Sequence, residues 1–190
     1  MDGDLGLIQI VDAALAEATR KSGPWLVCRP GCFECCIGPF AITPLDAARL
    51  REGLAELQPV DPGRAARVLA RATEAAERLK RDYPGDTFAR ILAEDGAAEN
   101  DPCPALDPEA GTCDLYAWRP ITCRTFGPPV HFAGEALGVC ELCYQGATDE
   151  QIAVCEVEMP AEPNAEGDTI VAFALTENLG TDGAFTRASP

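Results

Sequence analysis

The sequence predicts a mainly α-helical fold with small, irregular β segments, an α+β class, in a single domain of 190 residues. Apolar residues recur every three or four positions through much of the first half of the chain, which is typical of amphipathic helices. From Asn100 onward the chain consists of short runs broken by Pro and Gly. Ten cysteines fall into two groups, and residues 37–102 between the groups contain none. We therefore expect the helices to form a scaffold on which both cysteine-bearing segments meet.

The first two helices are predicted from periodicity and capping signals. Residues 4–21 carry one apolar stripe at helical spacing. Residues 22–42 interrupt this pattern with Gly and Pro and hold four of the cysteines. Thr43 is an N-cap residue followed by Pro at the first helical position, which predicts a helix over residues 44–57.

The next two helices begin with similar signals. Asp61 precedes Pro62 and predicts a helix to about Arg81. On the solvent-exposed face of that helix we expect two i,i+4 ion pairs, Glu74 with Arg78 and Glu77 with Arg81. After a turn at residues 83–85, Asp86 caps a short helix.

The second half of the chain predicts smaller elements. Residues 106–112 contain the turn residues of a hairpin between two cysteine-bearing segments. We expect a short strand within residues 134–140, a helix over residues 148–155 and a strand over residues 169–175. Residues 160–190 form a polar C-terminal tail whose role the sequence does not indicate.

The charge of the chain argues against several classes of partner. Lys and Arg total 15 against 31 Asp and Glu, which gives a formal net charge of −16. This charge repels phosphate backbones and anionic lipids, so we expect neither a nucleic-acid nor a membrane partner. The N-terminal segment carries Asp where a secretory signal carries Lys or Arg, and no stretch has the length of a membrane span. We expect a cytoplasmic protein with reduced thiols, which favours metal or redox chemistry over a disulfide framework.

The early cysteine group is Cys28, Cys32, Cys35 and Cys36, four thiols within nine residues. The spacing of Cys32 and Cys35 lets a tight turn direct both sulfurs to one point about 2.3 Å away, the zinc–sulfur distance. Burial as small hydrophobic residues explains one or two cysteines, but not four so close together. A disulfide between the neighbours Cys35 and Cys36 would be strained and reducible.

The later cysteines are Cys103, Cys113, Cys123, Cys140, Cys143 and Cys155. Four early and four late cysteines would supply two mononuclear sites, or one or two clusters. Ligation by sulfur alone favours zinc or iron–sulfur over Cu(I). Cys140 and Cys143 also have the spacing of a thioredoxin-type motif but lack the βαβ context, so metal ligation by one or both is expected. Cys155 is expected to be a core residue.

The shortage of histidine narrows the kind of site. His131 is the single histidine, which excludes Cys₂His₂ zinc fingers, Rieske clusters and the histidine-based hydrolytic zinc sites. Neither Cys-x-x-Cys pair is followed by His, which excludes covalent c-type haem. We expect His131 to be packed or hydrogen-bonded rather than a ligand.

The later cysteines belong to a specific sequence pattern, Cys103-Pro-Ala-Leu followed by Gly111-Thr-Cys113-Asp-Leu-Tyr116-Ala-Trp-Arg119-Pro120-Ile-Thr-Cys123-Arg124-Thr-Phe126. Together with the early group, this pattern resembles the YkgJ-type cysteine-cluster proteins, the zinc- or iron-chelating family named after its CxxCxxCC motif. The resemblance covers roughly residues 28–146, the expected metal-chelating core. One departure is the spacing of three residues, rather than two, between Cys28 and Cys32.

The resemblance implies a set of chelating residues, with Cys140 and Cys143 as alternatives for the last position: Cys28, Cys32, Cys35, Cys36, Cys103, Cys113, Cys123, Cys140 and Cys143. Two arginines of the motif are candidates for supporting the bound group. Arg124 could donate N–H groups to thiolates, and Arg119 with Pro120 could shape the turn before Cys123. Pairing of both arginines with carboxylates, for structure alone, is an equal alternative.

The sequence thus favours a metal-binding protein that chelates zinc or an iron–sulfur cluster through two cysteine groups. The alternative is an iron–sulfur oxidoreductase or electron-transfer protein, a description applied to the resembled family. Kinship of the cysteine cluster with flagellin lysine N-methylases suggests, more weakly, a role in protein modification. No phosphate-binding loop or nucleophile–base pair is visible, so the sequence does not decide whether the protein is an enzyme.

Overall fold

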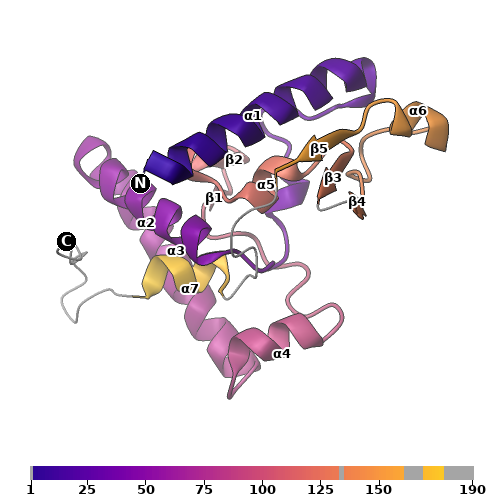
Figure 1. Cartoon of the computed structure of the whole chain (residues 1–190). Coiled ribbons are helices and arrows are strands. Elements are labelled where there is room, and N and C mark those ends of the chain that lie inside the picture. The colour runs from indigo at the N-terminus through magenta and orange to yellow at the C-terminus, as the bar shows by residue number, and fades with distance from the viewer. Residues whose placement is uncertain (1, 133–134, 161–168, 178–190) are drawn as a thin grey trace. The chain divides into compact units, whose positions relative to one another are not determined.

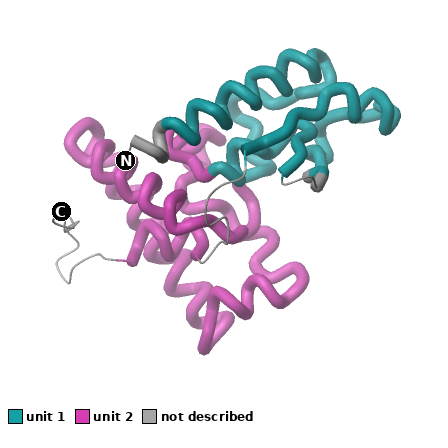
Figure 2. Tube along the Cα trace, viewed as in Figure 1, with its two compact units in different colours: residues 1–35, 121–165 teal, residues 36–120, 166–190 magenta. Residues whose placement is uncertain are grey.

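The computed structural model describes residues 2–132, 135–160 and 169–177. The described residues are mainly helical with small strands, which confirms the predicted α+β class (Figure 1). The chain divides into two compact units (Figure 2): residues 1–35 and 121–165 form unit 1, and residues 36–120 and 166–190 form unit 2. A core at residues 28–146 remains a prediction, and most of the predicted tail at residues 160–190 lies outside the described residues.

Unit 2 is built on helices whose start signals are local. Its helices are α2 (Pro44–Val60), α3 (Pro62–Asp82), α4 (Thr87–Ala93) and α7 (Val171–Thr176), with a 3-10 turn η3 (Tyr116–Trp118). The side chains of Thr43, Asp61 and Asp86 accept hydrogen bonds from backbone N–H groups in the first turns of α2, α3 and α4. The predicted caps are therefore confirmed, and α2 extends three residues beyond the predicted Leu57.

Apolar faces of α2, α3 and α7 form the main core of unit 2. Leu50, Leu54, Val68 and Leu175 are among its buried members. A second cluster joins the end of α3 to α4 and to the start of α7. A two-stranded antiparallel hairpin, β1 (Leu106–Asp107) and β2 (Thr112–Cys113), packs beside this core and confirms the hairpin predicted at residues 106–112.

Two sequence predictions for unit 2 are wrong. Residues 169–175 do not form a strand: Thr169 makes one bridge to Ile42, and Val171–Thr176 is helix α7. The apolar run is buried from Thr169 to Leu175, and a short, fully buried run has no periodicity that distinguishes a strand from a helix. The predicted i,i+4 pairs are also replaced, because Arg78 pairs with Asp101 and Arg81 with Asp82.

Unit 1 consists of the long helix α1 (Asp2–Ser22) and several short elements. These are the 3-10 turns η1 (Gly23–Trp25) and η2 (Glu34–Cys36, whose last residue belongs to unit 2), the helices α5 (Ile121–Thr125) and α6 (Asp149–Ala153), and the strands β3 (Val130–Phe132), β4 (Glu135–Leu137) and β5 (Val157–Met159). The strands form one sheet in the order β4-β3-β5, antiparallel between β4 and β3 and parallel between β3 and β5. The strand predicted at residues 134–140 and the helix predicted at residues 148–155 are present in shorter form.

The packing in unit 1 is divided between two small clusters. In the first, Val11 of α1 packs with Ile121, Val130 and Met159. In the second, Cys143, Tyr144 and Cys155 are buried together, with Trp25 and Leu26 against them. Within the part of the chain that the structure describes, no helix combines the length and the apolar character needed to cross a lipid bilayer.

Candidate metal centre

Four cysteines of unit 1 lie near one another: Cys28, Cys32, Cys140 and Cys143. We call them the unit 1 cysteine group. Of these, the Cys143 thiol acts most strongly on the pKa of Cys28, and Cys32 and Cys140 also interact with Cys28 electrostatically. The first two residues follow η1, and the last two lie between β4 and α6, more than a hundred residues later. The fold thus brings an early and a late cysteine segment together inside one unit.

The Cys140–Cys143 segment forms a tight turn around a sulfur atom. The Cys143 N–H donates to the Cys140 carbonyl at 2.8 Å. Burial raises the pKa of the Cys140 thiol, whereas hydrogen bonds from the backbone N–H groups of Leu142 and Cys143 act to lower it. N–H groups directed at a sulfur stabilise its thiolate form, which is the form that binds a metal ion. The turn therefore places both cysteines of this segment on one short loop that favours the thiolate form of Cys140.

Cys28 is influenced by all three other thiols of the group. Burial of its sulfur, followed by the neighbouring Cys143 thiol, raises the pKa of Cys28 to about 12. Gly127, with φ of +110°, lies close to this sulfur: a Cβ atom at that position would be 3.0 Å from Cys28 Sγ and 3.3 Å from Leu26 Cδ1. Both the backbone conformation and the close approach favour glycine there.

Tyr144 fixes the cysteine turn to the end of α1. Its backbone N–H donates to the Trp25 carbonyl at 3.0 Å, and its hydroxyl donates to Ser22 Oγ. The rings of Trp25 and Tyr144 are stacked, with centroids 6.4 Å apart and planes 12° from parallel. Tyr144 has a φ of +57°, a conformation that a bulky residue adopts only where its surroundings impose it. These contacts hold Cys143 beside the segment that carries Cys28.

Cys155 and His131 have hydrogen-bond partners other than the unit 1 cysteine group, although Cys155 is buried beside Cys143. Cys155 is buried, and its thiol donates toward the Lys21 and Gln151 carbonyls, both at 3.4 Å. His131 Nε2 lies 2.8 Å from Glu156 Oε2. The core role predicted for Cys155 and the hydrogen-bonded role predicted for His131 are therefore confirmed.

Cys36, Cys103 and Cys113 belong to unit 2. The Cys103 N–H donates to the Cys36 carbonyl at 2.7 Å, and an antiparallel bridge joins Ile37 to Pro102. Cys113 is the last residue of β2, and both Cys103 and Cys113 pack at the edge of the main core. An early and a late cysteine segment therefore also meet in unit 2.

A buried carboxylate holds the segment after Cys113, and the sequence analysis did not identify it. Asp114 Oδ1 accepts from Arg64 Nε at 2.5 Å, and Asp114 Oδ2 accepts from Arg71 Nη2 at 2.6 Å. Both arginines are on α3, so the two ion pairs fix the end of the hairpin to that helix. The residue types were a possible signal, because a buried Asp requires partners, but nothing local indicated which arginines these would be.

The remaining motif residues have these positions. Cys35 lies in η2, Cys123 lies in α5, and both are half-buried. Arg124 Nη1 donates to Asp12 Oδ1 of α1 at 2.7 Å, with its side chain 4% exposed. Arg119 lies over the Tyr116 ring, 3.8 Å from its centroid, and donates to the Tyr116 carbonyl at 2.9 Å. The contact of Arg124 with a carboxylate agrees with the structural alternative, and a role of either arginine toward a bound group stays a prediction.

The chemistry of the donor set fits a soft metal. Four thiols from two segments satisfy the ligand number and type of a tetrahedral zinc or iron site. Within residues 2–132, 135–160 and 169–177, no three Cys, His, Asp or Glu side chains already converge closely enough to hold an ion. The unit 1 cysteine group is therefore gathered around one region without being closed on a single point.

Comparison with known proteins gives one family. Residues 27–143, more than half of the chain, match the family model described as "CxxCxxCC: Putative zinc- or iron-chelating domain". No curated protein and no solved structure matches the chain. The matched range begins beside Cys28 and ends at Cys143, so it spans the whole unit 1 cysteine group, and the chain belongs to the CxxCxxCC family.

Proposed function

We propose that the protein chelates zinc or iron through its cysteines, and that the unit 1 cysteine group is a complete four-sulfur site. The observation that carries this proposal is the meeting of Cys28 and Cys32 with Cys140 and Cys143 inside a single unit. A core packing role does not require four thiols from two distant segments to interact. One metal ion bound by all four thiols would explain why they meet.

The site would form by loss of protons from thiols and closure of the four sulfurs. Thiolates are the metal-binding form of cysteine, so chelation releases the protons that the metal-free group holds. The backbones of Leu142 and Cys143 act to lower the pKa of Cys140 and would offset part of the charge of its thiolate. A bound zinc ion would supply structural cross-linking, and bound iron would also supply one-electron chemistry.

The other cysteines of the motif form a second candidate ligand set. Cys36 and Cys103 are joined through their backbones in unit 2, and Cys113 ends the adjacent hairpin. We propose these three residues in unit 2, and separately Cys35 and Cys123 in unit 1, as further chelating positions. Their assignment rests on the family motif, supported by the backbone contact between Cys36 and Cys103.

Metal analysis of the full chain tests the proposal. Protein purified without oxygen is expected to contain tightly bound zinc, or iron with sulfide, by elemental analysis and visible absorption. Colourless protein with zinc supports a structural or storage site, whereas iron and sulfide support a redox function. A folded protein that contains neither metal would contradict the proposal.

Single substitutions test the ligand assignment. Cys32→Ser and Cys140→Ser are expected to remove the unit 1 metal, since serine replaces a soft thiolate with a poor ligand for these metals. Cys155→Ser is the matched control, because Cys155 is buried in the same unit but donates to two backbone carbonyls. Equal metal content in Cys32→Ser, Cys140→Ser and Cys155→Ser would show that the unit 1 cysteine group does not bind the metal.

A further inference from the structure

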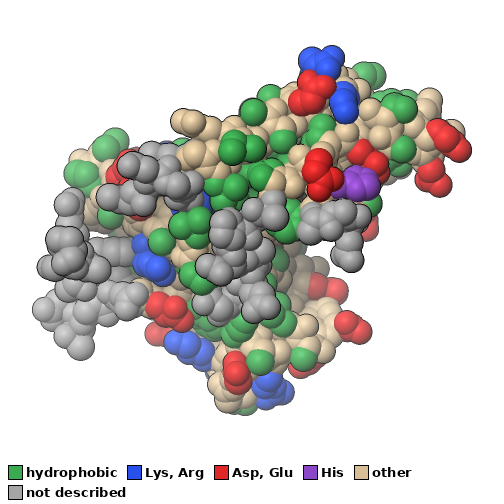
Figure 3. Space-filling view, viewed as in Figure 1, with side chains coloured by type: hydrophobic (Ala, Val, Ile, Leu, Met, Phe, Trp, Pro, Cys, Tyr) green, Lys and Arg blue, Asp and Glu red, His purple; other side chains and the backbone are tan. Residues whose placement is uncertain are grey.

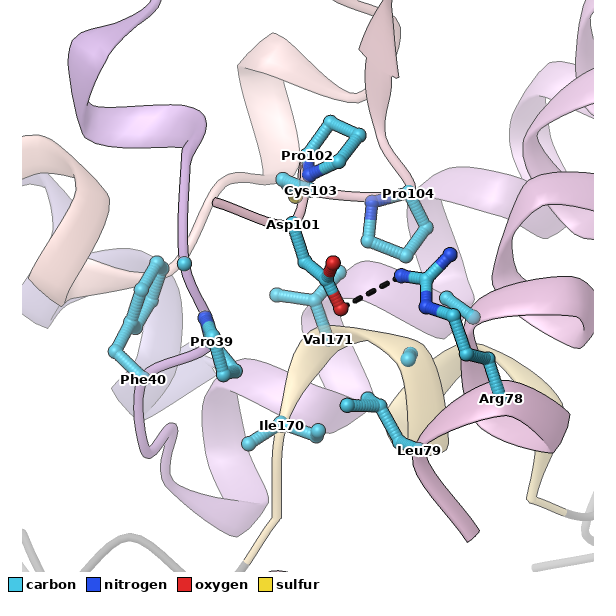
Figure 4. Close-up of a pocket in the computed structure, with 13 residues that line it drawn as sticks. Pro39, Phe40, Arg78, Leu79, Asp101, Pro102, Cys103, Pro104, Ile170 and Val171 are labelled. Atoms are coloured by element: carbon cyan, nitrogen blue, oxygen red, sulfur yellow. Dashed lines mark hydrogen bonds and ion pairs between the residues drawn. The ribbon is translucent and has the colours of Figure 1, made fainter. Parts of the chain in front are cut away.

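A depression in unit 2 combines an apolar floor with one ion pair (Figure 4). Its volume is about 380 Å³, including space open to solvent, and it lies between the end of α3, the start of α7 and the segment around Asp101. Leu79, Ile170 and Val171 are buried and contribute apolar surface to it. We call this depression the Arg78 pocket.

The proline-rich wall of the Arg78 pocket offers few polar groups. Pro39, Pro102 and Pro104 line it, and proline carries no backbone N–H donor. The Gly38 N–H is already used, because it donates to the Asp101 carbonyl at 2.8 Å. An aliphatic group that covers this wall would therefore break few hydrogen bonds between the protein and water.

Arg78 and Asp101 provide the polar groups. Arg78 Nη2 donates to Asp101 Oδ2 at 2.7 Å, and both side chains are about one-third exposed, at 33% and 31%. Among the described residues, the structure shows this one hydrogen bond from the Arg78 guanidinium. A guanidinium carries five N–H donors. The pair thus leaves guanidinium donors and a carboxylate acceptor beside the apolar floor.

We propose that the Arg78 pocket binds a neutral primary carboxamide that carries an aliphatic side chain. In such a group the carbonyl oxygen and one N–H lie on the same side, so the oxygen can accept from Arg78 while the N–H donates to Asp101. The ion pair has no net charge, so a charged ligand is attracted by one partner about as much as it is repelled by the other, and it must still lose water from its own charge. A neutral carboxamide reaches both partners without that desolvation cost.

This proposal goes beyond metal chelation and does not depend on it. The pocket is lined by residues of unit 2 alone, and the amide contacts involve Arg78 and Asp101, neither of which is a proposed metal ligand. Cys103 also lines the pocket, so metal content must be measured for every variant.

A charge series of small probes tests the proposal on the whole chain as purified, whatever metal it carries. N-acetyl-leucinamide is neutral, N-acetyl-leucine is anionic and leucinamide is cationic, and all three carry the same aliphatic side chain. Nuclear magnetic resonance titrations should show shifts at Leu79, Val171 and the Arg78 side chain. The neutral probe is expected to bind about tenfold more tightly than either charged probe. Equal shifts for all three, or shifts confined to other residues, would overturn the proposal.

A matched pair of substitutions on α3 provides the second measurement. Arg78→Met is expected to weaken binding of the neutral probe about tenfold, since it removes the donor. Arg81→Met is the control, because Arg81 is exposed and pairs with Asp82 outside the pocket. Unchanged binding in Arg78→Met would overturn the proposal, and should that variant not fold, the charge series in the unaltered chain decides. If the purified chain contains no metal but still binds the amide, the proposed chelation is contradicted and the proposed amide binding is not.

Discussion

The two units differ in what fills their interiors. Unit 2 has a main core of aliphatic residues from α2, α3 and α7, and its buried Asp114 pairs with two arginines of α3. Unit 1 has two small clusters, and the second consists of Cys143, Tyr144 and Cys155 with aromatic and aliphatic neighbours. Unit 2 is stabilised by the burial of apolar side chains. In unit 1, cysteine side chains occupy part of the interior instead of larger apolar side chains. We infer that the stability of unit 1 depends on a bound metal, whereas the aliphatic core of unit 2 is stable without one.

Metal removal is expected to have the largest effect and to separate the two units. Because site formation is coupled to folding, removal of the ion is expected to lower the free energy of unfolding of unit 1 by several kcal/mol or more. Amide hydrogen exchange after chelator treatment should accelerate at residues 25–32 and 140–144. Exchange at Leu54 and Val68 in the unit 2 core should be unchanged. Equal acceleration in both units would break the comparison.

A cavity in the unit 2 core should have the next largest effect. Leu50 is 1% exposed, and Leu50→Ala is expected to lower the free energy of unfolding by about 2–5 kcal/mol. Val60→Ala on the same helix is the control, because Val60 is 81% exposed and its truncation should change stability by less than about 0.5 kcal/mol. Urea unfolding measures both variants. The cost of Leu50→Ala should persist in metal-free protein, and its disappearance there would contradict the independence of unit 2.

The hydroxyl of Tyr144 should make a smaller contribution, confined to unit 1. Tyr144→Phe keeps the stacking on Trp25 but removes the hydrogen bond to Ser22, at a cost of about 1 kcal/mol. The matched control is Tyr116→Phe, since Tyr116 is exposed. If Tyr144 positions Cys143, its variant should also weaken metal binding in a competition with a chromophoric chelator. A purely structural role would lower stability and leave that competition unchanged.

Ionisation of the Cys28 thiol is expected to have the smallest effect on stability, and it concerns the metal-free form of unit 1. The pKa of Cys28 is raised from 9.0 to about 12, so folding favours its protonated form. The stability contribution of this thiol is therefore present below pH 9.0 and is lost as the pH rises toward 12. Alkylation of metal-free, reduced protein, followed by mass spectrometry, should show Cys28 reacting with an ionisation midpoint above 9.0. A midpoint near neutrality would show that the thiols do not hold their protons as the structure indicates.

Features governed by neighbouring residues could be predicted from the sequence. Thr43 and Asp61 accept hydrogen bonds within the next three residues, so their capping roles were visible in the sequence itself. The same holds for the hairpin before Cys113. The helix α7 was missed because its buried apolar run has no exposed face to reveal a period.

Features that depend on topology could not be predicted. The motif named Cys28, Cys32, Cys140 and Cys143, but not that these four belong together in one unit, since no local signal relates segments so far apart. Arg78 shows the same limit: helical spacing favoured Glu74, whereas the fold supplies Asp101 from a distant loop. Tyr144 carried no signal at all, because its left-handed backbone is imposed by Trp25 and Ser22.

Because unit 1 is interrupted by residues 36–120, it cannot be completed in the order in which the chain is synthesised. Cys28 and Cys32 emerge from the ribosome roughly 110 residues before Cys143, which at typical elongation rates corresponds to roughly 5 to 20 s. The helices α2 and α3 are made during that interval and have their caps and much of their apolar surface available at once. The early thiols, by contrast, must wait without their partners, which makes the nascent chain more sensitive to oxidants and stray metal ions than the finished protein.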